Sequence, residues 1–144
     1  MSDATGVVGG IVGSTLEERI ESVRHFLEAN LRHDLDLHTL SRHALISPYY
    51  LNRAFRAQIG VPPHRYLIGL RVERAAELLL HTPLTVTQIC HRVGFGSLSH
   101  FITTFRRHRG LSPTRYRRVM IQPDMGTFRG EMDAHKAVRR RPDV

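Results

Sequence analysis

The chain has 144 residues, of which 41% are hydrophobic and 24% are charged, a balance typical of a globular protein. No run approaches the roughly 18 apolar residues of a membrane helix, and the first residues lack the basic start of a secretory signal. Cys90 is the single cysteine, which excludes an internal disulfide and fits a reducing compartment. We therefore expect a cytoplasmic protein without a membrane partner.

The net charge of +8 is unevenly divided along the chain. Residues 1–47 hold four arginines against seven carboxylates, whereas residues 48–118 hold twelve arginines against two carboxylates. A basic half of this kind suggests a polyanion as partner, and arginine suits forked contacts with phosphates and guanine edges. A host whose proteins are generally rich in arginine would give the same imbalance, so charge alone leaves both interpretations open.

Seven helices are predicted from apolar periodicity and capping signals, and no segment alternates convincingly like a strand. Ser47 and Ser112 are each followed by proline, which gives an N-cap and then the residue that a first helical turn accepts. Gly60 and Gly110 supply helix stops. The predicted helices span approximately residues 16–30, 37–44, 48–59, 62–81, 86–93, 98–109 and 113–120. The expected fold class is therefore all-α.

An internal repeat covers both halves of the chain. Residues 55–66 read FRAQIGVPPHRY and residues 105–116 read FRRHRGLSPTRY, with six of twelve positions identical and no gap. Ser47 and Ser97 match at the same spacing of fifty, but further upstream the spacing is forty-nine, so the second copy has one extra residue near Gly94–Gly96. Each copy contains two short helices joined by a tight turn. This is a helix-turn-helix, whose second helix can lie in a major groove.

The repeat predicts a seven-helix bundle with two helix-turn-helix subdomains joined by a long linker helix. A linker of about 18 residues spans roughly 27 Å. Together with the packing at its ends, it can separate two recognition helices by nearly one DNA turn, roughly 34 Å. One chain could thus enter two successive major grooves without dimerising. The expected order is a flexible arm (1–14), a first subdomain (15–61), the linker helix (62–82), a second subdomain (83–121) and a poorly ordered tail (122–144).

The outward faces of the two recognition helices differ. In residues 48–59 the predicted apolar stripe is Leu51, Phe55 and Ile59. The opposite face is polar and basic: Tyr49, Asn52, Arg53 and Arg56. In residues 98–109 the corresponding outward side chains are Leu98, Ser99, Ile102, Thr103, Arg106 and Arg107. Asparagine and arginine read adenine and guanine edges through paired hydrogen bonds, so the first face is better equipped to read bases.

The second copy, VTQICHRVGFGSLSHFITTFRRHRGLSPTRYR at residues 86–117, resembles the DNA-binding domain of the AraC/XylS family of bacterial transcription regulators. The first copy also fits, and the resemblance covers roughly residues 16–120. It implies a two-motif domain that binds double-stranded promoter DNA at the nucleoid and usually activates transcription by touching RNA polymerase. By position, the implied base-reading residues are Tyr49, Asn52 and Arg53 in the first copy and Leu98, Ser99 and Thr103 in the second.

Two departures from the family pattern affect the interpretation. The place of Thr103 is often arginine in the family, and neither Leu98 nor Ser99 offers a two-pronged contact. We therefore expect the second helix to read mainly thymine methyls, shape and phosphate, and the first to supply most base discrimination. The family also commonly attaches a sensing or dimerising domain, for which about fifteen preceding residues leave no room. A stand-alone small member and a cut domain both remain open, and the Met-Ser-Asp start favours the former.

Phosphate contacts are expected from arginines on or beside the recognition helices and from the two N-cap serines. These residues are Ser47, Arg56, Arg65, Ser97, Arg106, Arg107 and Arg115. The alternative for each is a capping or solvated side chain. No ligand pattern for a metal, no catalytic constellation and no cofactor motif is visible, so we expect a protein that is not an enzyme. Two other functions stay open: an interaction module whose acidic first helix docks a partner, and a non-specific architectural DNA binder.

Overall fold

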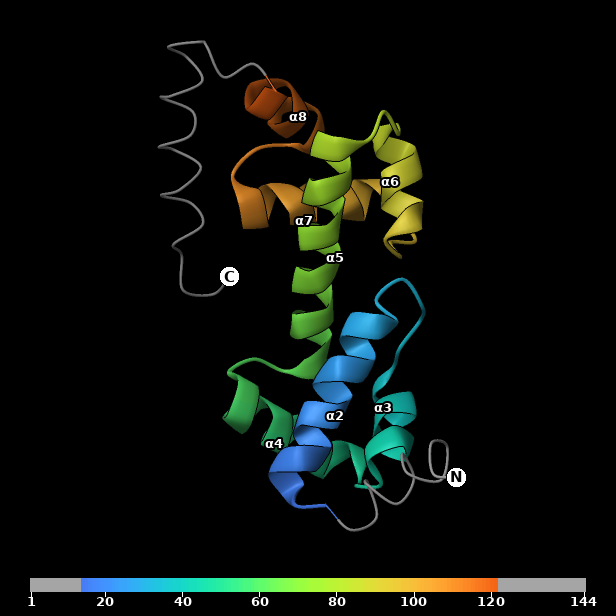
Figure 1. Cartoon of the computed structure of the whole chain (residues 1–144), viewed down its shortest axis with the longest axis vertical. Coiled ribbons are helices and arrows are strands. Elements are labelled where there is room, and N and C mark those ends of the chain that lie inside the picture. The colour runs from blue at the N-terminus through green and yellow to red at the C-terminus, as the bar shows by residue number, and fades with distance from the viewer. Residues whose placement is uncertain (1–13, 122–144) are drawn as a thin grey trace. The chain divides into compact units, whose positions relative to one another are not determined.

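The computed structural model of the chain describes residues 14–121, and this part consists of seven α-helices without a strand (Figure 1). The all-α prediction is confirmed for these residues. The predicted tail and all but the last residue of the predicted arm lie outside them. The helices are α2 (Leu16–Ala29), α3 (Leu37–Ala44), α4 (Pro48–Ile59), α5 (Pro63–His81), α6 (Val86–Arg92), α7 (Leu98–Arg109) and α8 (Pro113–Ile121).

Side chains cap the starts of the helices. The hydroxyls of Thr15 and Thr85 accept from backbone amides three residues on, and Glu18 and Gln88 close both capping boxes. Asp36 caps α3 in the same way through the backbone amide of Thr39. These local hydrogen bonds satisfy amides that have no partner inside the helix, which is why short helices of seven or eight residues can form here.

Three helix ends lie in the left-handed backbone region. Gly60 and Gly110 end α4 and α7 with φ of 107° and 85°, as their predicted role as stops requires. Leu45, which ends α3, has φ of 58° although it is not glycine. The carbonyl oxygen of Leu45 accepts a hydrogen bond from Nη1 of Arg19 at 3.4 Å. This strained end was not predicted, because leucine gives no signal for a positive φ.

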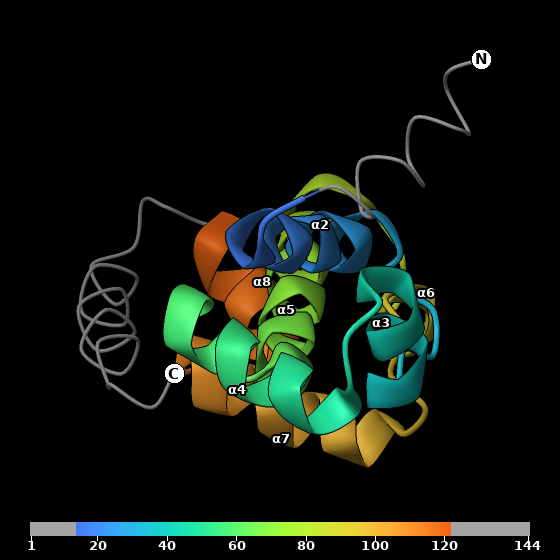
Figure 2. The ribbon, with the colours of Figure 1, turned by 90° about the horizontal axis from the view of Figure 1, so that it is seen from below.

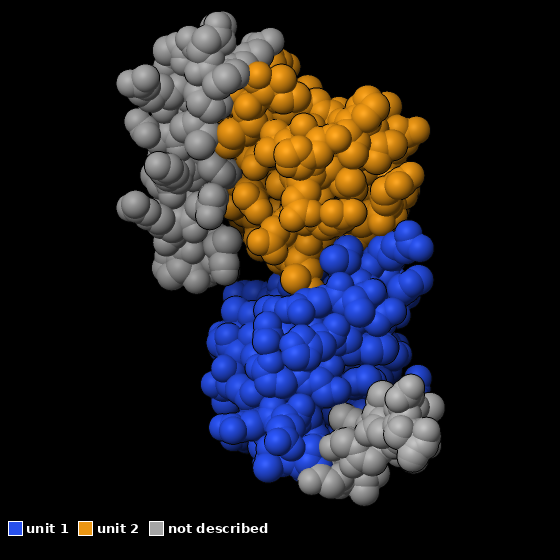
Figure 3. Space-filling view, viewed as in Figure 1, with its two compact units in different colours: residues 1–68 blue, residues 69–144 orange. Residues whose placement is uncertain are grey.

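The chain divides into two compact units, residues 1–68 and 69–144 (Figure 3). The boundary falls within α5, so the first turns of that helix belong to one unit and the remainder to the other. In the first unit α3 leads into α4 through a short turn, as a second view also shows (Figure 2). The subdomain limits expected from the sequence, which treat the linker as a separate element, remain a prediction.

Each unit has its own apolar interior. In the first unit fully buried side chains from α2, α3 and α4 meet: Ile20, Val23, Leu27, Ala44, Leu51 and Phe55. In the second unit the interior is aromatic, with successive ring centroids 5.1, 5.8 and 5.3 Å apart along the row Phe95, Phe101, Phe105 and Tyr116. Phe55 likewise packs edge-on against Tyr66 at 5.7 Å. The repeated phenylalanines are therefore core residues, and the repeated tyrosines pack edge-on against them.

The two turns locate the extra residue of the second copy. In the first turn the Ser41 hydroxyl donates to the carbonyl of Ile46 at 2.7 Å, and in the second the Cys90 thiol lies 3.8 Å from the carbonyl of Phe95. Ile46 and Phe95 are thus equivalent. In the first copy Ser47, which caps α4, directly follows Ile46. In the second copy Gly96 lies between Phe95 and Ser97, which caps α7. The inserted residue is therefore Gly96.

Candidate nucleic-acid interface

The outward face of α4 is polar and open to solvent. Leu51 and Phe55 are fully buried, which turns the opposite side of the helix outward. On that side Tyr49 is 71% exposed, Arg53 and Arg56 are also exposed, and Asn52 is half-buried. Ile59, expected in the apolar stripe, is only half-buried since the helix ends at this residue. The structure therefore brings the residues proposed for the first copy onto one helical face.

Arg53 is held against Tyr49 on this face. Nη1 of Arg53 donates a hydrogen bond to the Tyr49 hydroxyl at 3.2 Å, and the guanidinium carbon lies 5.7 Å from the centre of the tyrosine ring. The two residues are four positions apart and so lie on adjacent turns of α4. The contact was not predicted, although the spacing of an aromatic residue and an arginine is a signal for it.

The outward face of α7 has the same register but different chemistry. Leu98 is 37% exposed, and Ser99 and Thr103 are exposed, whereas Ile102 is half-buried. Thr104 is buried, with 4% of its surface exposed. Thr104 was missed as an interior residue, although it follows the buried Phe101 by three positions, which is helical spacing. None of Leu98, Ser99 and Thr103 offers the paired hydrogen bonds that asparagine or arginine makes.

The end of α7 is strongly basic. Its last turn carries Arg106, Arg107, His108 and Arg109, whereas the last turn of α4 carries Arg56 alone. Arg106 and Arg107 are exposed. Cations at this end are favoured by the helix dipole, and exposed guanidinium groups bind phosphates through forked hydrogen bonds. The side chains of the second recognition helix are therefore suited to the DNA backbone more than to base edges.

The N-cap serines have an established structural task. The hydroxyls of Ser47 and Ser97 each accept from a backbone amide at 3.2 Å, from Tyr50 and His100 respectively. Arg65 and Arg115 lie exposed near the starts of α5 and α8. Phosphate binding by these four residues stays a prediction, since capping accounts for the serines without DNA.

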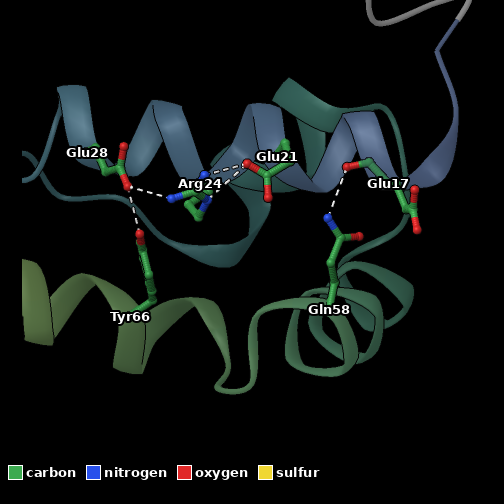
Figure 4. A network of polar contacts seen from close by, with 6 residues as sticks. All are labelled: Glu17, Glu21, Arg24, Glu28, Gln58 and Tyr66. Atoms are coloured by element: carbon green, nitrogen blue, oxygen red, sulfur yellow. Dashed lines mark hydrogen bonds and ion pairs between the residues drawn. The ribbon is translucent and has the colours of Figure 1, made fainter.

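The acidic helix α2 is tied to the first turns of α5 by a polar network (Figure 4). The Tyr66 hydroxyl donates to Oε2 of Glu28 at 2.7 Å, and Arg24 donates to the same oxygen at 3.2 Å. Arg24 also binds Glu21, with its Nη2 at 2.6 Å from Oε1. Burial, followed by the bond to Glu28, raises the pKa of Tyr66. The hydrogen bond from Arg24 lowers the pKa of Glu21.

The carboxylates of the acidic helix α2 are largely engaged within the protein. Two of its carboxylates, on Glu21 and Glu28, already face Arg24, and a third, on Glu18, closes the capping box of α2. A helix whose charges are engaged in this way offers less to a basic partner than its sequence suggests. The Gln58 amide also donates to the backbone carbonyl of Glu17 at 3.2 Å, which ties α4 to α2 (Figure 4).

Not every arginine is available to a polyanion. Nε of Arg117 donates to the carbonyl of Leu79 at 2.9 Å, and Nη2 donates to the carbonyl of Thr82 at 3.0 Å. Arg117 therefore satisfies carbonyls at the C-terminal end of α5, which would otherwise lack partners. Some of the arginines thus stabilise the fold, whereas others face solvent.

Other kinds of site find little support among residues 14–121. No three metal-ligating side chains gather there in a group able to hold an ion. None of the helices in this part is both long and apolar enough to cross a membrane. Cys90 is buried, and burial raises the pKa of its thiol, so the reactive thiolate is disfavoured.

Comparisons with known proteins identify the family of this domain. A family model described as a helix-turn-helix domain matches residues 40–119. The transcriptional activator RhaS of Enterobacter sp. (strain 638) is 35% identical over 101 residues, which cover 70% of this chain and 36% of that protein. The chain thus spans little more than a third of the length of this curated relative.

Two solved structures share the fold over about three quarters of the chain. An AraC-type transcriptional regulator from Chromobacterium violaceum is 30% identical with a TM-score of 0.69, and the match covers 74% of this chain and 96% of that one. The DNA-binding domain of the global transcriptional factor AdpA, in complex with a target DNA, is 30% identical with a TM-score of 0.68 and coverages of 74% and 97%. The chain belongs to the AraC-type family of helix-turn-helix DNA-binding domains, whose members are transcription regulators and not enzymes.

Proposed function

We propose that this protein is a sequence-specific DNA-binding transcription regulator, acting as an activator, that places α4 and α7 in successive major grooves of a promoter. The observation that carries the proposal is the outward face of α4, where Tyr49, Asn52 and Arg53 stand together on a helix anchored by two fully buried side chains. Residues 37–72 contain no carboxylate to repel a phosphate backbone.

The two helices have different tasks in this proposal. Asn52 and Arg53 can each make paired hydrogen bonds to base edges, so α4 determines the DNA sequence that is bound. Leu98, Ser99 and Thr103 reach thymine methyls and groove shape, while Arg106 and Arg107 hold the backbone. Monomeric binding is sufficient, because one chain carries both helices. A contact with RNA polymerase and a place in the cytoplasm at the nucleoid complete the proposal.

Selection of binding sites from random double-stranded DNA, read by sequencing, tests this function. We expect one enriched motif with two blocks about one helical turn apart, of which one block is the more informative. Affinity for the selected site should fall steeply with salt, since several phosphates are neutralised. Equal and weak binding to all DNA would contradict the proposal and support an architectural role.

A further inference from the structure

The contact between Arg53 and Tyr49 has the properties of a positioning device. It combines a hydrogen bond of 3.2 Å from Nη1 to the tyrosine hydroxyl with a guanidinium that lies 5.7 Å from the ring centre. Tyr49 is 71% exposed, so its ring does not fill the core. An exposed aromatic side chain that meets an exposed arginine one turn away orders that arginine at the surface.

Arg53 has no competing anchor in its part of the chain. The nearest carboxylates in the sequence are Asp36 and Glu73. Among residues 14–121, the ion pairs of Arg24 and Arg74 do not involve Arg53. A long arginine side chain loses much rotamer freedom when it binds. A contact that restricts Arg53 before DNA arrives therefore removes part of that loss.

The contact leaves the donors needed for a guanine free. A guanidinium has five N–H groups, and paired recognition of guanine O6 and N7 uses two of them. The bond to Tyr49 uses one, so both contacts can exist together. The Tyr49 hydroxyl accepts from Arg53 and keeps its own proton, which it can donate to a phosphate.

We infer that Tyr49 is a positioning residue that holds the Arg53 guanidinium on the outward face of α4, in place for a guanine edge. The inference rests on the proposed function, and it gives Tyr49 a role that acts through Arg53 and not through a base of its own. The second copy provides a contrast, because Ser99 and Thr103 stand at the equivalent positions and have neither a ring nor a guanidinium.

A double-mutant cycle on the full chain tests the inference. Binding is measured to the selected DNA site and to the same site with one guanine–cytosine pair replaced. The replaced pair is the one at which Arg53→Ala abolishes the base preference of the protein. We expect Arg53→Ala to lower discrimination at that pair about tenfold or more. Tyr49→Phe, which keeps the ring, should lower it roughly threefold, and Tyr49→Leu somewhat further. In the Arg53→Ala background neither tyrosine substitution should lower it again.

Controls separate this role from others. Tyr50→Phe removes the hydroxyl of the other tyrosine that lies one turn before Arg53; because the Arg53 guanidinium donates to Tyr49 instead, this substitution should leave discrimination unchanged. In the free protein, nuclear magnetic resonance should show ring-shifted Arg53 side-chain protons that move on Tyr49→Leu. The inference is overturned if Tyr49→Phe alters preference at another base pair, or acts equally without Arg53. A selection that enriches no motif overturns the proposed function itself, whereas the two preceding results leave it standing.

Discussion

α4 carries Tyr49, Asn52 and Arg53 on its outward face, whereas α7 carries Ser99, Ile102 and Thr103 at the same three positions of the repeat. The inward positions are alike, since Leu51 and Phe55 match Phe101 and Phe105 and all four are fully buried. The interior of a helix-turn-helix therefore specifies the fold, and the opposite face is free to specify what the fold binds. One scaffold used twice can in this way divide base reading from backbone binding.

The largest effect is expected from the interior of the second unit. Phe105 is fully buried between Phe101 and Tyr116, with ring centroids at 5.8 and 5.3 Å. Phe105→Ala should lower the free energy of unfolding of the second unit by about 3–5 kcal/mol, because it removes a large side chain and leaves a cavity. Urea unfolding followed by circular dichroism measures this. A loss below about 1 kcal/mol would mean that the ring is not a core residue, and the exposed Arg107→Ala is the control.

Backbone binding by α7 predicts a smaller effect that is blind to sequence. Arg106→Ala should weaken binding to every DNA by about 1.5 kcal/mol, since one charge-assisted contact to a phosphate is lost. The slope of log affinity against log salt should also fall by about one. Fluorescence anisotropy at several salt concentrations, on selected and scrambled sites, gives both numbers. A loss confined to the selected site would instead assign Arg106 to base reading.

The polar network around α2 should contribute to the stability of the first unit. Tyr66→Phe removes the hydroxyl that donates to Glu28 at 2.7 Å but keeps the ring on Phe55. We expect a loss of about 1 kcal/mol in the free energy of unfolding, because Glu28 keeps its bond to Arg24. Urea unfolding measures the change, and the exposed Tyr50→Phe should give none. A larger loss from Tyr50→Phe would contradict this ranking.

A modest pH effect should also distinguish the units. The His43 ring stacks on Phe26 with centroids 4.4 Å apart, and its Nε2 lies 2.9 Å from the Ser22 hydroxyl. Burial lowers the pKa of His43 from its ordinary 6.5, so the folded unit favours the neutral ring. This contribution to stability is complete above about pH 6.5 and is lost as the pH falls below it toward the lowered folded value.

His43→Phe isolates this effect. Urea unfolding between pH 7.5 and pH 5 should show a fall in stability for the parent chain that is smaller in the variant. The repeat places the exposed Arg92, and not a histidine, at the equivalent position of the second unit, so the effect is expected from the first unit. An equal fall in both chains would remove His43 from the explanation.

Local signals in the sequence were sufficient for the helices and for the residues that point outward on α4. Caps such as Thr15 and stops such as Gly60 act within four residues, so they can be read from the chain itself. Other contacts could not be read from the chain itself. The hydrogen bond from Arg117 to the end of α5 joins residues that lie far apart in sequence. The network around Arg24 joins α2 to α5 and depends on how these helices pack. The left-handed end of α3 at Leu45 has no residue signal, because leucine is not a residue type that favours a positive φ.

The division of tasks between α4 and α7 is tested most directly by parallel selections from random DNA. One uses the full chain with Asn52→Ala and Arg53→Ala, and the other uses the matched pair Ile102→Ala and Thr103→Ala. We predict that the first pair erases the informative block of the parent motif, while the second leaves both blocks recognisable. Loss of the strong block in the second selection, with the motif retained in the first, would contradict the assignment of base reading to α4.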